Sequence, residues 1–356
     1  MNGIFVVGRY GSGKTAICLG LSLKLKERGL KVGYFKPIGV ADPLTCRFDD
    51  DVLLMRSVLG MAETHDDLTC YCIGPQYLSR YDMSEDHTKE VKARLKEMSS
   101  EYDVLIIEGT TYPYVMASLG LDAISLSRDL GLPVLFVAQP ASDYSVDRVI
   151  LYDRYMSLSG IRVLGNIFNN VPRPLLDKVV GVYKPIIEKH GFKVLGIIPK
   201  SLEISLPTVR EYYAILGGEL LSGEDHMDRL VEDIVVGAMT QESAIQYLRR
   251  SRNKAVVTGG DRADLALAAL ETDTSVIILT GGLYPNVQVL ARAQEKKVPV
   301  ILVHYDTYTT VEKLHTVTRK IKPEDKAGID QAKRNLEEHC DLEALLEGVT
   351  GLGSKP

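Results

Sequence analysis

The first fifteen residues constrain the fold of this chain more than any other stretch. Residues Ile4–Val7 form a short apolar run that is typical of a buried strand. The segment Gly8–Thr15 then reads GRYGSGKT and fits the phosphate-binding pattern G-x-x-x-x-G-K-[ST] without a mismatch. Residues Ala16–Lys26 follow with a helical pattern, so the motif lies between a strand and a helix, as its mechanism requires.

This loop predicts a nucleotide site built largely from backbone. The glycines let the chain curl so that N–H groups point inward, and the N-terminus of the following helix adds partial positive charge. We expect Lys14 to reach the β- and γ-phosphates and the Thr15 hydroxyl to bind Mg²⁺. The residues predicted to contact the nucleotide are Gly8, Gly11, Ser12, Gly13, Lys14, Thr15 and Ala16.

The bulk composition narrows the classes of partner. The formal net charge is −5 and no long basic run occurs, so we do not expect nucleic acid as the main partner. No apolar run reaches the roughly 18 residues of a membrane span, and no signal peptide precedes the first strand, so we expect a cytoplasmic protein without membrane contact.

Five cysteines, an odd number scattered over 356 residues, argue against a disulfide framework. Cys70 and Cys72 are predicted to be reduced strand residues rather than metal ligands, because no nearby Cys or His completes a tetrahedral set.

Up to about residue 208, short apolar runs alternate with helical stretches. This alternation predicts an α/β fold with a parallel sheet that is covered by helices on both faces. Ligands in such folds bind at the carboxyl ends of the strands. The expected strands are Ile4–Val7, Val32–Phe35, Val104–Ile107, Val134–Val137, Val163–Phe168 and Val194–Ile198.

Polar residues follow three of these strands and open one helical stretch, and they are candidates for the site. Lys36 could neutralise a phosphate or an acidic substrate, or it could be a solvated loop residue. Asp49–Asp51 opens a helical stretch, where one acid could cap the helix and another could serve Mg²⁺. Glu108 ends a strand, where it could hold Mg²⁺ or merely precede a turn. The Asn169 amide matches the adenine edge, with a turn role before Pro172 as the alternative.

The order of these phrases (GKT, YFKPIG, an Asp at a helix start, IIEGT, LPVLFV, a strand ending in Asn, and GIIP) resembles dethiobiotin synthetase. That family and the cobyrinic acid a,c-diamide synthases form a branch of P-loop proteins, and the resemblance covers about residues 1–208. It implies that Lys14 and Thr15 hold phosphate and metal, and that Lys36 lies near a transferred phosphoryl group. It further implies that Asp51 and Glu108 serve Mg²⁺ and that Asn169 contacts adenine.

The rest of the chain indicates a second, smaller α/β domain at residues 209–322, followed by a C-terminal helical tail at residues 323–356. The phrases Gly259-Gly260-Asp261-Arg262 and Thr280-Gly281-Gly282 resemble the DRTGG domain. The two-domain layout resembles the N-terminal extension of long-form phosphate acetyltransferases and stand-alone relatives. We expect no acetyltransferase reaction, because that catalytic domain would need hundreds of further residues.

Three functions are compatible with these features. The first is an ATP-binding, and by extension ATP-hydrolysing, regulatory protein whose second domain senses an unknown small molecule or joins subunits. The second is a ligase that activates a carboxylate or carbamate with ATP. The third is a scaffold with an inactive nucleotide site, which Lys14, Thr15, Asp51 and Glu108 argue against. The family's Gly-Gly pair after the acid is replaced here by Thr111-Tyr112, which favours the first. We expect a homodimer, because a second domain of about 100 residues has a limited core of its own.

Overall fold

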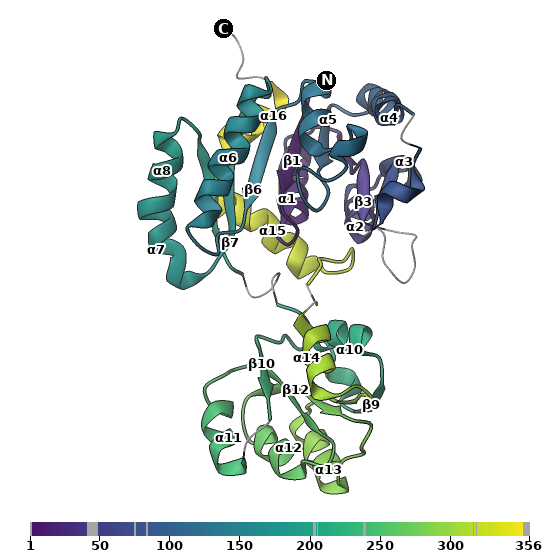
Figure 1. Ribbon diagram of the computed structural model, residues 1–356, viewed down its shortest axis with the longest axis vertical. Helices are drawn as coiled ribbons and strands as arrows, with labels where there is room; N and C mark the ends of the chain where they lie inside the picture. The colour runs from purple at the N-terminus through teal and green to yellow at the C-terminus, as the bar shows by residue number, and fades with distance from the viewer. Residues whose placement is uncertain are drawn as a thin grey trace. The chain divides into compact units, whose positions relative to one another are not determined.

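The computed structural model of the chain describes residues 2–40, 49–74, 76–82, 85–201, 204, 206–237, 240–315, 317 and 319–351. These residues form two compact units (Figure 1). The first contains residues 1–201 and 320–356, and the second contains residues 202–319. The chain therefore leaves the first unit, builds the second and then returns to the first.

The first unit is organised around a six-stranded sheet in the order β2-β5-β1-β6-β7-β8, in which every neighbouring pair is parallel. All six strands predicted from the apolar runs are present, which confirms the predicted parallel fold. Their bounds are β1 (Gly3–Gly8), β2 (Val32–Phe35), β5 (Val104–Glu108), β6 (Val134–Ala138), β7 (Val163–Val171) and β8 (Val194–Pro199).

Helices cover both faces of this sheet. From β1 the chain crosses to β2 on one side, whereas from β6 it crosses to β7 on the other. Right-handed crossovers in opposite directions place α1 and α6 on opposite faces and open a crevice at the carboxyl ends of β1 and β6. The helical segments of this unit are α1 (Lys14–Glu27), α2 (Asp50–Leu59), α3 (His65–Leu68), η1 (Tyr77–Arg80), α4 (Thr88–Glu101), η2 (Ala117–Leu119), α5 (Ala123–Leu130), α6 (Tyr144–Leu158), η3 (Arg173–Leu175), α7 (Leu176–Lys178), η4 (Val179–Tyr183), α8 (Lys184–Lys189), α15 (Lys326–His339) and α16 (Leu342–Thr350).

The C-terminal helices belong to this first unit. Helix α15 packs along α1 so closely that a Cβ on Gly20 would lie 2.6 Å from the Ala332 carbonyl oxygen. Leu336, Leu345 and Val349 are buried in the same core as β1. The apolar stripes of these two helices are therefore buried within the first unit.

A small parallel sheet of β3 (Ile38–Val40) and β4 (Tyr71–Ile73) lies beyond the end of β2. Cys72 lies in β4 and Cys70 directly precedes it, and both are free, as are Cys18 and Cys340. Cys46 lies outside the described residues.

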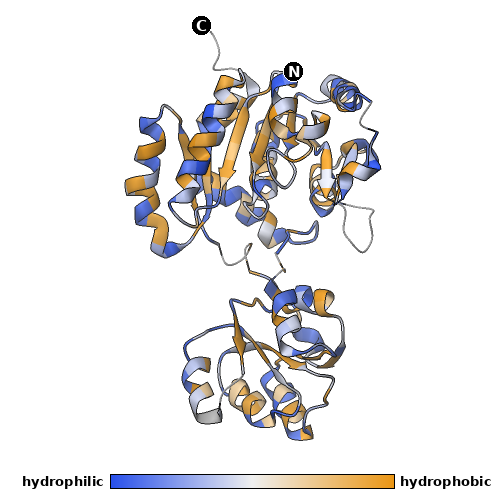
Figure 2. Ribbon diagram, viewed as in Figure 1, coloured by the Kyte–Doolittle hydropathy of each residue, from blue (hydrophilic) through white to orange (hydrophobic). Residues whose placement is uncertain are grey.

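The second unit has a five-stranded sheet in the order β10-β11-β12-β13-β9, parallel except for the antiparallel edge strand β9. Two apolar clusters pack against its two faces, and Figure 2 shows its central strands as hydrophobic. The elements are α10 (Val209–Leu216), β9 (Glu219–Ser222), η5 (Glu224–His226), β10 (Asp233–Val236), α11 (Gln241–Leu248), β11 (Lys254–Gly259), α12 (Ala263–Leu270), β12 (Thr274–Thr280), α13 (Val287–Lys296), β13 (Val300–Leu302) and α14 (Thr307–His315). Among the helices described in either unit, none is long and apolar enough to cross a membrane.

Candidate functional site

The loop between β1 and α1 is shaped by two glycines in the left-handed region. Gly11 has φ 74° and Gly13, the N-cap of α1, has φ 82°. Gly8 has no space for a side chain, because a Cβ there would lie 2.3 Å from the Val137 carbonyl oxygen on β6. The Lys14 ammonium folds back over the loop and donates to the carbonyls of Gly8 at 3.3 Å and Arg9 at 3.1 Å. Lys14 is buried at the start of α1, and the resulting loss of hydration lowers the pKa of its ammonium group.

Asn169, in β7 two residues before its last residue, supports the same loop from the other side. Its amide nitrogen donates to the Ser12 carbonyl at 2.9 Å, and its side chain is almost fully buried. A Cβ on Gly13 would lie 2.2 Å from that nitrogen, so the amide fits only against a glycine. The structure thus brings Asn169 to the loop backbone, and contact with adenine stays an expectation.

Thr15 and Glu108 meet at the carboxyl edge of the sheet. The Thr15 hydroxyl donates to Glu108 Oε1 at 2.8 Å, and the buried Tyr34 hydroxyl donates to Glu108 Oε2 at 2.8 Å. Both carboxylate oxygens are therefore held by hydroxyl groups. Burial raises the pKa of Glu108 and raises the pKa of Tyr34.

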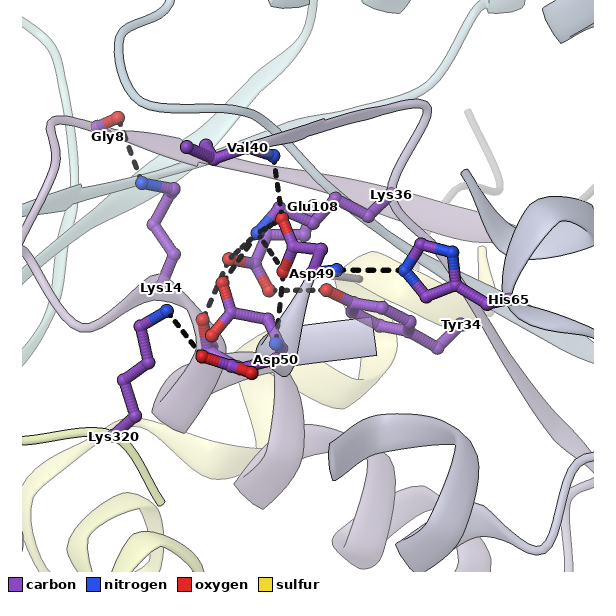
Figure 3. A network of polar contacts seen from close by, with 12 residues as sticks. Gly8, Lys14, Tyr34, Lys36, Val40, Asp49, Asp50, His65, Glu108 and Lys320 are labelled. Atoms are coloured by element: carbon purple, nitrogen blue, oxygen red, sulfur yellow. Dashed lines mark hydrogen bonds and ion pairs between the residues drawn. The ribbon is translucent and has the colours of Figure 1, made fainter. Parts of the chain in front are cut away.

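Lys36 is the centre of a buried charge cluster (Figure 3). Its ammonium lies 2.5 Å from Asp51 Oδ2, 2.9 Å from Asp49 Oδ2 and 4.0 Å from Glu108 Oε1. Only 4% of the Lys36 side chain is exposed, so the alternative of a solvated loop lysine is wrong. Burial by itself would lower the pKa of Lys36, but the three carboxylates outweigh it and raise the pKa. Burial likewise opposes ionisation of Asp51, yet the Lys36 ammonium lowers the pKa of Asp51 to about 2.

Helix α2 positions the acids of this cluster. Asp49 is its N-cap and accepts from the Asp51 N–H at 3.0 Å, while its other oxygen accepts from the Val40 N–H at 2.8 Å. The Asp49 N–H donates to His65 Nε2 at 2.9 Å. Asp49 is thus the acid that caps the helix, and it also pairs with Lys36, a contact that was not predicted from the sequence.

Three residues of this site have no prominent signal in the sequence: Tyr34, His65 and Lys320. Tyr34 lies in β2, two residues before Lys36, which directly follows the strand. In extended chain this spacing directs both side chains to the same side, which was the only available hint. Lys320 lies at the return of the chain to the first unit and donates to Asp50 Oδ2 at 2.8 Å. It is 270 positions away from Asp50, so no local pattern could predict the contact.

The oxygen atoms at this edge suit a hard cation. Mg²⁺ prefers oxygen ligands and keeps several waters, taking one or two carboxylates together with substrate phosphates. The adjacent Thr15 hydroxyl and Glu108 carboxylate match that requirement, and Asp51 is linked to them through Lys36. Within the described residues, no group of three or more His, Cys, Asp or Glu side chains is arranged as a complete metal site by itself. A metal at this edge would therefore depend on the phosphates for further ligands.

Comparison with known proteins places the chain among P-loop proteins. It is 26% identical over 357 residues to the phosphate acetyltransferase of Nitratidesulfovibrio vulgaris, covering 94% of this chain and 49% of that protein. It is 29% identical over 217 residues to the ATP-dependent dethiobiotin synthetase BioD of Bacillus licheniformis, covering 58% of this chain and 89% of that enzyme. Among solved structures, the septum site-determining protein MinD of Pyrococcus horikoshii, complexed with Mg-ADP, matches with a TM-score of 0.36 at 17% identity, over 57% of this chain and 83% of that one.

The chain spans about half the length of the phosphate acetyltransferases that it matches, so the comparison does not assign their activity to it. A model of the DRTGG domain matches residues 211–317, which confirms the resemblance seen in the second half. A model of the AAA domain matches residues 2–208, more than half of the chain. The chain therefore belongs to the AAA domain family, with a DRTGG domain following the P-loop domain.

Proposed function

We propose that the first unit binds Mg²⁺–ATP and that the whole chain is a nucleotide-dependent regulatory protein. The observation that carries this proposal is the clustering of Lys14, the Thr15–Glu108 pair and the Lys36–Asp51 pair at one edge of the sheet. Two cations there suit the phosphates, and the hydroxyl and carboxylate oxygens suit the metal. The Mg-ADP in the MinD structure and the ATP dependence named for BioD concern those proteins and agree with the proposal.

Calorimetry with the full chain tests the nucleotide site. We expect saturable binding of Mg²⁺–ATP, and at least a hundredfold loss of affinity in Lys14→Ala, because a buried ammonium contact to phosphate is removed. Lys26→Ala is a matched control, since this lysine lies at the opposite end of α1 and donates to the Leu59 carbonyl. Unchanged ATP affinity in Lys14→Ala would refute the assignment.

A ligase is the second candidate, because Lys36 is held rigidly by Asp49 and Asp51 beside the phosphate loop. A fixed cation there could stabilise charge on a transferred phosphoryl group. Phosphate release separates the two functions. A ligase should hydrolyse ATP faster when mixtures of small carboxylates or amines are added, whereas a regulatory protein should show a slow rate that these compounds leave unchanged.

We further propose that Lys14 and Lys36 contact the phosphates, that Thr15, Asp51 and Glu108 serve Mg²⁺, and that the working form is a homodimer. The dimer rests on the small size of the second unit. Light scattering of the full chain at micromolar concentration tests it, and a monomer with and without Mg²⁺–ATP would contradict it.

A further inference from the structure

A cavity of about 250 Å³ lies next to the phosphate loop, on the side away from the Lys36 cluster. It is lined by Arg9 of the loop, by the end of β6, by the first half of α6 and by the segment that follows β5. The Gly109 N–H donates to the carbonyl of Val6 in β1, so the segment that follows β5 begins next to β1. The cavity thus occupies the crevice between β1 and β6, where the direction of the crossovers reverses.

The walls of the cavity are aromatic. Phe136, on β6, stacks on Tyr152, on α6, with ring centroids 5.3 Å apart and 29° between the ring planes. Tyr112 and Tyr114 form a second stacked pair, with centroids 5.5 Å apart and 17° between the planes. The first pair is largely covered, whereas Tyr112 is 41% exposed and Tyr114 is 56% exposed. Faces of this kind accept a flat, apolar body by stacking.

Two arginines add positive charge to these walls. Arg9 and Arg148 are both half-buried, and within the described part of the chain neither has a carboxylate partner. The contact of Arg148 to the Ser145 hydroxyl is long, at 3.5 Å. Burial and the neighbouring Tyr114 raise the pKa of Tyr152 while the Arg148 guanidinium lowers it, so these three side chains share one environment. Two half-buried arginines that lack a carboxylate partner among the described residues suit an anionic ligand.

We propose that this cavity binds a small organic anion, in which a carboxylate or phosphate group is attached to a flat apolar body. The arginines would hold the oxyanion and the tyrosines would stack on the body. A volume below the roughly 300–1,000 Å³ of drug-sized sites limits the ligand to a small molecule. The ligand site is separate from the proposed ATP site, because the residues that form it do not include Lys14, Thr15 or Glu108.

The test uses the full chain with benzoate and phenyl phosphate as probes and benzamide as the neutral analogue of benzoate. Titrations by calorimetry at constant ionic strength should show saturable binding of at least one anion, with benzamide at least tenfold weaker. Whichever anion binds more tightly identifies the head group. No saturation by either anion, or equal binding of benzamide and benzoate, would overturn the proposal.

Matched variants locate the binding. Arg148→Gln and Tyr114→Ala should each weaken the preferred anion at least tenfold, whereas Arg173→Gln and Tyr155→Ala, at exposed positions outside the cavity, should leave it unchanged. Equal affinity in Arg148→Gln and the native chain would refute the site.

Two further titrations separate this proposal from ATP binding. Lys14→Ala should lose ATP but keep the anion within a factor of two, and the anion site stands even if the native chain does not bind ATP. If saturating Mg²⁺–ATP abolishes binding of the anion, the cavity is part of the nucleotide site and the proposal fails.

Discussion

Replacing Lys36 by Met should strongly destabilise the first unit. In the native chain the attraction of Lys36 lowers the pKa of Asp51 from an ordinary 3.8 to about 2, which corresponds to about 2 kcal/mol of stability at pH 7. The Asp51 side chain is only 23% exposed, so solvent screens this attraction little. The variant also leaves Asp49 and Glu108 without their cation. Removing one partner of a buried ion pair costs about 3–5 kcal/mol in total.

Differential scanning calorimetry of the full chain measures this effect. At roughly 2–4 °C per kcal/mol for a unit of this size, the expected fall in Tm is about 6–20 °C. Lys254→Met is the matched control, because this fully buried lysine of the second unit donates to the backbone carbonyls of Ser251 and Asp273. Loss of the Lys254 ammonium should lower the free energy of unfolding of the second unit by about 1–3 kcal/mol. The calorimetric transition that this variant shifts is therefore the unfolding of the second unit.

The pH dependence gives a second test of the same reasoning. A carboxyl whose folded pKa is depressed contributes stability that is fully present above its unfolded pKa, here 3.8, and is lost as pH falls through about 2. The native chain therefore keeps the Asp51 contribution unchanged between pH 7 and pH 5. In Lys36→Met the buried carboxyls have lost their cation, so we expect raised pKa values. Their ionised forms then destabilise the folded first unit at pH 7, and protonation restores part of its stability as the pH falls. The difference in Tm between variant and native chain should narrow at pH 5, whereas that of Lys254→Met should not change. A difference below about 2 °C at pH 7, or one that is the same at both pH values, would refute the reasoning.

Three other predictions concern the loop and the metal. Gly13→Ala should lower ATP affinity over a hundredfold by calorimetry, because its Cβ would lie 2.2 Å from the Asn169 amide. Gly191→Ala is the control, since Gly191 has φ 86° and open space around it, and it should leave ATP affinity unchanged. Similar affinities for both variants would contradict this prediction. Asn169→Ala should weaken ATP only about two- to tenfold, the cost of one neutral hydrogen bond to the Ser12 carbonyl. A loss beyond a hundredfold would indicate direct contact with the nucleotide. Glu108→Gln should raise the Mg²⁺ concentration needed for half-maximal ATP binding at least tenfold while leaving metal-free binding unchanged or tighter, and an unaltered Mg²⁺ requirement would exclude Glu108 from the metal site.

The fold of the first unit could be predicted because its signals are local. Each strand contains a short apolar run, although β7 also holds Asn166, Asn169 and Asn170. The predicted β2 agrees with the observed strand at both ends. The carboxyl ends of parallel strands share one edge, so Lys36 and Glu108 come within 4.0 Å of each other although they are 72 positions apart. The order of the strands within the sheet was not predicted and is known from the structure.

Other features depend on contacts that a single sequence does not encode locally. The three-residue strands β3 and β4 are too short for a periodic signal. The packing of α15 against Gly20 is a long-range contact. An amphipathic pattern indicates that one face of a helix is buried, but it does not identify the element that covers this face. The two arginines of the cavity have ordinary sequence surroundings, and the reversal of crossovers at β1 and β6 is what places Arg9 and Arg148 together.

The charge balance at the carboxyl edge argues that metal and nucleotide bind together. Lys14 and Lys36 supply two positive charges, and Asp49, Asp51 and Glu108 supply three negative charges when all are ionised, a net charge of −1. A nucleotide without metal would bring further negative charge against these buried carboxylates, where repulsion is screened little. A divalent cation at the Thr15–Glu108 pair would reverse the sign of the edge. It would also stabilise the ionised form of Glu108 and so oppose the effect of burial, which raises the pKa of this carboxyl. If the first unit binds ATP as we propose, the buried carboxylates would oppose the binding of free ATP and favour its magnesium complex.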